Sequence, residues 1–351
     1  MRKGRVTIKD VAQAAEVNPS VVSRILNHDE TLVVRPETRE RVWDAVQQMG
    51  YRPNATARSL RTRKNRLIAI VISGFLDPYF ALILENANRV ADQRGYVVGV
   101  LSTESDDQRG AKCLETIFDT GMAGAVLASS YIEESTLARI RYSDMPMVLL
   151  RRNGWEFGKM SIMEDENSGA ALAMEHLISL GHTRIAHIAG SLYSRSGLKR
   201  LEGYRKALHV HGIPYRAEYM QESDEAQCRL GVGQTRLDGY RAMLRLLDLD
   251  ERPTAVFAFN DTIALGAVDA VLERALRIPE DISIIGYGNT MSEFNFPKLT
   301  TVDGQMARIG ALAAEMLINA IESESGEYPH EEILIQPELV VRKTTAPPPE
   351  T

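Results

Sequence analysis

The sequence predicts an α/β protein in which a small, all-helical N-terminal domain precedes a larger part built from two doubly wound parallel sheets. Charge is divided unevenly along the 351 residues. Residues 1–66 contain 14 Lys and Arg against 7 Asp and Glu, a net charge of +7, whereas the remaining residues sum to −13. Helical periodicity marks the basic part, and alternating strand and helix patterns mark the acidic part. A basic head on an acidic body is expected when a phosphate-binding module is attached to a larger domain.

The basic part begins with two short helices and a tight bend, predicted over residues 7–27. Apolar residues recur at i, i+3, i+4 and i+7 from Ile8 to Ala15, which is typical of one buried helix face. Thr7 and Asp10 have the spacing of a capping box and start this first helix.

Asn18 caps the second helix, and Pro19 occupies its first position, where a missing N–H costs nothing. The residues that remain on its outer face are Pro19, Ser20, Ser23, Arg24 and Asn27. Short polar groups with one arginine suit a helix that enters a DNA major groove and reads base edges. An ordinary pair of packed helices is the alternative, and the basic charge favours the DNA-reading hypothesis.

A third helix is predicted from the apolar pattern of residues 42–49, and Gly50 stops it. Its apolar face closes a three-helix core. The run after Pro53 is compatible with a helix but too short to hold one alone in water, so its order must depend on a partner.

From residue 66 onward, short apolar runs alternate with helical patterns. A helix is expected over residues 79–94, and strands are expected at residues 67–72, 96–101, 124–128, 147–150, 185–188, 255–259 and 282–285. This alternation argues for two doubly wound parallel sheets. Two such lobes facing each other across a cleft form a natural ligand site at the carboxyl ends of the strands.

Composition excludes several classes of protein. No apolar run reaches the length of a membrane span, and the N-terminus lacks the apolar region of a secretory signal. Cys113 and Cys228 are isolated, without metal-ligand spacing, and are expected to be reduced thiols. We therefore expect a cytoplasmic protein with no membrane partner and no cofactor.

Four strings in one order carry a resemblance to a known family: Thr-Ile-Lys-Asp-Val-Ala, Val-Ser-Arg-Ile-Leu-Asn, Gly-Tyr-Arg-Pro-Asn and Ala-Arg-Ser-Leu. They resemble the headpiece and hinge of the lactose/galactose repressor family of bacterial transcription regulators, and the resemblance continues to about residue 344. It implies a helix-turn-helix headpiece (1–52), a hinge (53–65), a two-lobed effector and dimerisation domain similar to periplasmic binding proteins (66–345) and a disordered tail (346–351). The chain would cross between the lobes three times.

The resemblance also implies which residues contact DNA: Thr7, Pro19, Ser20, Ser23, Arg24, Asn27, Arg35, Asn54, Ala57 and Leu60. Arg24 is the strongest base-reading candidate, because its fork matches guanine O6 and N7; a surface or phosphate-contacting arginine is the alternative. Leu60 would be a minor-groove wedge that kinks the duplex, or else a hinge-packing residue. Two departures stand out: Glu16 replaces the usual turn glycine, and Arg35 replaces the serine that usually caps the third helix.

By the same resemblance, the effector would contact Asp77, Tyr79, Phe80, Arg151, Asp165, Arg200, Asn260 and Asp261. Asp261 could instead act only as a helix N-cap. Sugar-binding members carry carboxylates where this chain has Arg151 and Gly288. Since arginine favours carboxylates and phosphates, we expect an anionic effector, such as a sugar acid or sugar phosphate. The alternative is that Arg151 points to solvent or pairs with Glu164 or Glu166, leaving a neutral sugar.

Two other functions compete with that of a DNA-binding repressor. The chain lacks the glycine-rich, phosphate-cradling and nucleophile-elbow motifs of common enzymes, so we expect no enzyme. A solute-binding protein without a DNA role would lack the basic headpiece. We expect a homodimer that reads a palindromic operator, joined partly through the helix at residues 79–94 and its second-lobe counterpart. Ligand binding is expected to release the operator, since release is the commoner sign in the family.

Overall fold

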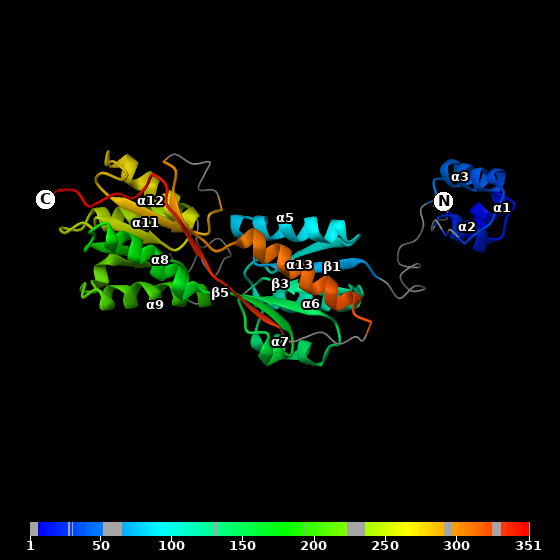
Figure 1. Cartoon of the computed structure of the whole chain (residues 1–351), viewed down its shortest axis with the longest axis horizontal. Helices are drawn as coiled ribbons and strands as arrows, with labels where there is room; N and C mark the ends of the chain where they lie inside the picture. The colour runs from blue at the N-terminus through cyan, green and yellow to red at the C-terminus, as the bar shows by residue number, and fades with distance from the viewer. Residues whose placement is uncertain are drawn as a thin grey trace. The chain divides into compact units, whose positions relative to one another are not determined.

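The computed structural model describes residues 6–26, 29, 31–51, 65–129, 132–192, 194–222, 236–290, 297–324 and 331–350. The chain divides into two compact units: residues 1–65, which include the headpiece, and residues 66–351, which we call the body (Figure 1). No helix in these ranges has the length and apolarity needed to cross a bilayer.

The headpiece is built from the helices α1 (Ile8–Ala14), α2 (Pro19–Leu26) and α3 (Pro36–Met49). The predicted capping box is confirmed, because Thr7 and Asp10 bond reciprocally at the start of α1. Asn18 accepts a hydrogen bond from the Ser20 amide at 3.0 Å, which caps α2 as predicted. The three helices bury one small core: Val11, Ala12, Ala15, Val22, Ile25, Val42 and Ala45.

The first lobe of the body contains a six-stranded parallel sheet in the order β11-β5-β4-β3-β1-β2. Its strands are β1 (Leu67–Ile72), β2 (Val97–Ser102), β3 (Gly124–Leu127), β4 (Met147–Leu150), β5 (Met160–Glu164) and β11 (Glu332–Ile335). Its helices are α5 (Pro78–Gln93), α6 (Asp107–Asp119), α7 (Glu134–Ala138) and α13 (Met306–Glu322). Helices α5 and α13 pack together on one face of the sheet, and α6 and α7 pack on the other (Figure 1).

The second lobe contains a six-stranded sheet in the order β12-β10-β9-β8-β6-β7. Its strands are β6 (Ile185–Ala189), β7 (Met220–Glu222), β8 (Ala255–Ala258), β9 (Ser283–Tyr287), β10 (Thr300–Asp303) and β12 (Glu338–Val340), of which only β12 is antiparallel to its neighbour. Helices α8 (Glu166–Ser179) and α9 (Arg195–Val210) cover one face. Helices α11 (Arg236–Leu247) and α12 (Asp261–Glu273) cover the other, as the green and yellow pairs show (Figure 1).

The chain crosses between the lobes three times, after β5, after β10 and after β11. This crossing pattern and the two doubly wound sheets confirm the predicted fold class. The carboxyl ends of β1, β4, β5 and β8 lead into the segments that carry most of the predicted effector residues.

One prediction is wrong at its boundary. Ala346, the first residue of the tail predicted to be disordered, makes hydrogen bonds through both its backbone carbonyl and its backbone amide. Its carbonyl accepts from His182 and Ser283, and its amide donates to Ser283. Thr344, two residues before Ala346, is fully buried, so the C-terminal segment up to Ala346 is part of the second lobe.

Candidate functional site

The outer face of α2 is polar, as its periodicity predicts. Val22 and Ile25 are fully buried, whereas Ser20 and Arg24 are exposed and Pro19 and Ser23 are half-buried. The predicted DNA contacts Asn27, Asn54, Ala57 and Leu60 lie outside the described residues.

Arg24 has partners that sequence reasoning missed. Its Nε donates to Asp29 Oδ2 at 2.7 Å, and its Nη2 donates to the Thr31 hydroxyl at 2.8 Å. Both partners follow α2 at separations of five and seven residues, outside the i, i+3 and i, i+4 pairs by which a helical sequence signals side-chain contact.

The two departures from the family pattern each affect the local structure of the headpiece. Glu16 adopts a left-handed φ of 54° in the α1–α2 turn, a conformation that favours glycine. Arg35 stands at the N-cap of α3 and makes no side-chain capping bond, as its residue type predicts. Its exposed guanidinium is therefore available as a charge.

In the body, two predicted arginines meet at one carboxylate between the lobes. Arg200 Nε donates to Glu166 Oε2 at 2.6 Å, and Arg151 Nη2 lies 3.6 Å from Glu166 Oε1. Arg151 also donates to Ser196 at the start of α9, so this side chain at the end of β4 reaches from the first lobe to the second. Burial alone would raise the pKa of Glu166, but Arg200 and Arg151 hold that pKa below its usual value.

A second acid completes this group of charges. Burial and the neighbouring Glu166 carboxylate raise the pKa of Glu164 to about 8. Glu164 is therefore protonated at neutral pH, and its Oε1 accepts a hydrogen bond from the Tyr287 hydroxyl at 2.6 Å. We call Arg151, Glu164, Glu166 and Arg200 the interlobe cluster. At pH 7 the cluster has two positive charges and one negative charge.

Aromatic rings enclose the cluster. The guanidinium carbon of Arg151 lies 4.8 Å from the Tyr79 ring centre, and that of Arg200 lies 3.4 Å from the Tyr287 ring centre and 4.5 Å from that of Phe259. Such faces stabilise desolvated cations. Among the described residues, the buried Arg151 Nε and Glu164 Oε2 have no hydrogen-bond partner.

The other predicted effector residues divide into two groups. Asp77 caps α5 by accepting from the Tyr79 amide at 3.0 Å, and burial raises the pKa of its carboxyl. Asp165 caps α8 by accepting from Ser168. Phe80 is buried in the first-lobe core, in edge contact with Tyr79. These residues cap helices or pack in the core, whereas Tyr79, Arg151 and Arg200 meet at the interlobe cluster.

The interpretation of Asp261 as a helix cap is wrong. Asn260 is the N-cap of α12, and its Oδ1 accepts from the Ile263 amide at 2.8 Å. Asp261 is 1% exposed, and its two oxygens accept from the Thr301 hydroxyl at 2.6 Å and the Thr290 amide at 2.8 Å. It fastens the carboxyl end of β9 to β10, which the residue order could not reveal.

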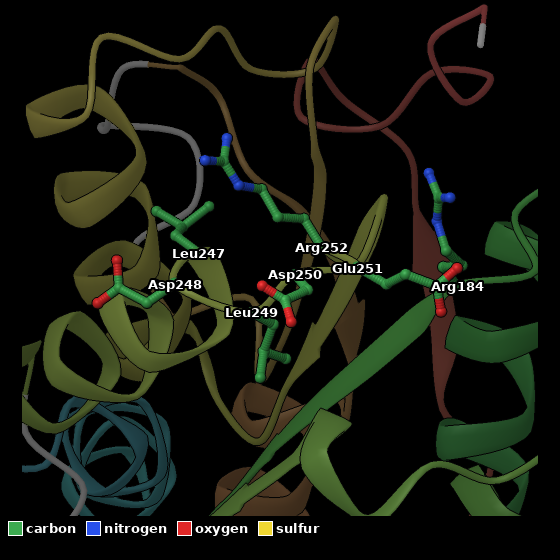
Figure 2. A pocket seen from close by; sticks show the side chains of 7 residues that line it. All are labelled: Arg184, Leu247, Asp248, Leu249, Asp250, Glu251 and Arg252. Carbon is green, nitrogen blue, oxygen red and sulfur yellow. The ribbon is translucent and has the colours of Figure 1, made fainter.

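Ser196 and Tyr287 contact the interlobe cluster, and sequence reasoning missed both. Ser196 is 45 residues from its partner Arg151, and Tyr287 is 123 residues from its partner Glu164. Only the packing of the lobes brings each pair together. A separate, open depression of about 610 Å³ lies beside the loop after α11, between Arg184 and residues 247–252 (Figure 2). Neither cluster nor headpiece residues line it.

Comparisons with known proteins agree with this architecture. Residues 7–54 match the model of bacterial regulatory proteins of the lacI family, and residues 174–345 match a periplasmic binding protein-like domain. The transcriptional repressor PurR of Actinobacillus pleuropneumoniae serotype 3 (strain JL03) is 34% identical over 340 residues, which cover 96% of this chain and 98% of the relative. PurR of Histophilus somni (strain 2336) is 33% identical over the same length.

Solved structures give the same answer. A lac repressor dimer bound to operator and the anti-inducer ONPF superimposes with a TM-score of 0.82 at 28% identity, covering 97% of this chain and 99% of that one. A complex of the regulator CelR with cellobiose has a TM-score of 0.69 at 27% identity, covering 97% and 100%.

Fold and site together define a DNA-binding transcriptional regulator with a two-lobed effector domain rather than an enzyme. The chain belongs to the lacI family of bacterial regulatory proteins.

Proposed function

We propose that this protein is a transcriptional repressor that binds a palindromic operator as a homodimer and releases it when a small anionic carbohydrate binds between the lobes. The polar outer face of α2 on a basic headpiece supports DNA reading. Related repressors carry the same architecture over nearly the whole chain, and one of them has been seen as a dimer on its operator.

One observation carries the choice of an anionic effector: the interlobe cluster has an excess positive charge and an unused donor. Glu166 is the one cluster carboxylate that is ionised at pH 7, because the pKa of Glu164 is raised to about 8. Arg151 reaches Glu166 only at 3.6 Å, and its Nε has no partner among the described residues. A ligand carboxylate or phosphate would satisfy this donor and balance the charge.

A neutral sugar is the second candidate, because Glu166 already lies beside both arginines. Related structures contain cellobiose and ribose, which carry no charge. In that case Glu166 and Asp77 would accept hydrogen bonds from sugar hydroxyls while the arginines stay paired.

A thermal-shift panel decides between these candidates. We expect aldonates, uronates or sugar phosphates to raise the unfolding temperature, and we expect Arg151→Gln to abolish that rise. Arg205→Gln, which removes an exposed arginine of α9, is the matched control and should respond like the wild type. Stabilisation by neutral sugars alone would refute the anionic effector and leave the repressor assignment standing.

The dimer is proposed to form along α5 and the edge strand β2. Val97 on β2 is 64% exposed, and β2 is the last strand in the order of its sheet. We expect Val97→Glu to convert dimers to monomers in sedimentation and to weaken operator binding. Unchanged dimers would place the interface elsewhere.

The hinge residue Leu60 is proposed to wedge into the minor groove at the operator centre. Leu60→Gly should then weaken specific binding far more than non-specific binding, because only the specific complex offsets the cost of the kink. Titrations of both DNAs at one salt concentration measure this difference. Equal loss on both would rule out the wedge.

A further inference from the structure

The loop after α2 presents an acid and a hydroxyl to Arg24, the base-reading candidate. Asp29 Oδ2 accepts from Arg24 Nε at 2.7 Å, and Thr31 Oγ1 accepts from Arg24 Nη2 at 2.8 Å. Nε and Nη2 form one edge of the planar guanidinium, so the two acceptors hold that edge together.

The two acceptors are themselves fixed to each other. Asp29 Oδ1 accepts from both the Thr31 amide at 2.9 Å and the Thr31 hydroxyl at 2.7 Å. The hydrogen bonds from Arg24 and Thr31 lower the pKa of Asp29 to about 2. The carboxylate therefore stays ionised, and Asp29 and Thr31 present their two acceptors together.

We propose that Asp29, assisted by Thr31, is a positioning residue that holds Arg24 for end-on recognition of one guanine in each operator half-site. The inference rests on the proposed DNA-reading role of Arg24. A guanidinium has five N–H donors in a fixed fork, and the two bonds to Asp29 and Thr31 use only two of them. The end formed by Nη1 and Nη2 is the geometry that pairs with guanine O6 and N7.

Holding the fork serves specificity rather than affinity. An unrestrained arginine on an exposed helix can turn to a phosphate, which carries no sequence information. Its long side chain also loses rotamer freedom when it binds. Because Asp29 occupies one edge of the guanidinium, it keeps Arg24 from turning to a phosphate. Its negative charge also weakens the general attraction of the headpiece for phosphate.

Removing Asp29 should therefore change base preference and non-specific affinity in opposite directions, so the two effects can be measured separately. Asp29→Asn should reduce the preference for guanine over other bases at one position by at least about threefold, out of the roughly 5- to 150-fold that a bidentate contact gives. Non-specific affinity should stay equal or rise, because one negative charge is lost.

The test is selection of operators from a random DNA library by the full-length chain, followed by base-by-base competition at fixed salt. Arg24→Ala identifies the base pair that Arg24 reads, and Asp29→Asn should lower the preference at that same base pair. Thr31→Val should act in the same direction and more weakly. Asp44→Asn, which removes one exposed acid from α3, should leave every base preference unchanged. Unchanged amide hydrogen exchange in α1 and α2 shows that each variant headpiece is folded.

The outcomes separate the inference from the function beneath it. If Arg24→Ala flattens one position and Asp29→Asn does not, positioning by Asp29 is overturned while base reading by Arg24 stands. An equal gain in affinity on all sequences for Asp29→Asn, with base preferences intact, also overturns it. If Arg24→Ala flattens no position, the proposed role of Arg24 fails and the inference falls with it.

Discussion

Two headpiece positions are occupied by residues that are poorly suited to the backbone conformation or the capping role there. Glu16 bears the left-handed turn between α1 and α2, and Arg35 begins α3 without a side-chain cap. The left-handed turn and the missing cap both lower the stability of the domain that we propose to contact DNA. Local strain and unsatisfied helix ends are each worth about 1 kcal/mol, a sizeable share of the stability of a small domain.

Replacing Glu16 by glycine should stabilise the headpiece by about 1 kcal/mol, because glycine adopts a positive φ without steric cost. The ion pair that this change removes, with Arg41 at 3.6 Å, joins two exposed side chains and adds little. Amide hydrogen exchange in α1 and α2 measures the opening free energy in the full chain. Faster exchange in Glu16→Gly would show that the turn is not strained.

Arg35→Ser should have opposite effects on stability and on DNA binding. A serine at this N-cap should stabilise α3 by about 1 kcal/mol. If Arg35 contacts phosphate, specific and non-specific affinity should fall together, and the slope of log K against log salt should decrease by roughly 0.9. Titrations at several salt concentrations provide both values. An unaltered slope would remove Arg35 from the DNA contacts.

At the scale of helices and strands, sequence predicted the apolar elements well and the more polar strands poorly. The all-apolar run of β1 was predicted to its exact bounds, and α5 to within one residue at each end. Strands β5, β7, β10, β11 and β12 were not predicted, because polar residues interrupt or bound their short apolar runs. Arg151 and Arg200 were predicted as effector contacts from the family resemblance. Their contacts with Ser196 and Tyr287 depend on how the lobes meet, which local pattern does not encode.

The packing of α5 on α13 depends on close backbone contact at Gly310. A Cβ at Gly310 would lie 2.3 Å from the Ile83 carbonyl oxygen, which belongs to backbone and cannot swing aside. Although alanine favours helices by about 1 kcal/mol, Gly310→Ala should destabilise the body, since overpacking typically costs about 1–3 kcal/mol. Urea unfolding monitors the change, and a gain in stability would contradict the tight contact.

The interlobe cluster makes the stability of the body depend on pH. The pKa of Glu164 in the folded protein, about 8, lies above the usual glutamate value of 4.5, so its protonated form stabilises the fold. That contribution is complete below pH 4.5 and is lost as pH rises toward and through 8. Between pH 6 and pH 9, Glu164→Gln should therefore lose less stability than the wild type in urea unfolding. Parallel curves for the two proteins would mean that Glu164 is ionised throughout this range.

At the scale of the whole molecule, the proposed function is a coupling between two sites. Arg151 joins the lobes through Ser196 and Glu166, so a ligand that takes over its guanidinium changes the contacts by which one lobe holds the other. Such a ligand shifts operator affinity only by its difference in affinity for the two states of the body. A coupling of about 1–3 kcal/mol, or roughly 5- to 150-fold, is the usual range.

The most direct measurement is the affinity of the full-length chain for its selected palindromic operator, at fixed salt, with and without the sugar acid or sugar phosphate that stabilises it most. We predict that the anion weakens operator binding by roughly tenfold or more in the wild type and has no effect on Arg151→Gln. An anion that changes both proteins equally, or a neutral sugar that alone releases the operator, would contradict an effector site built on Arg151.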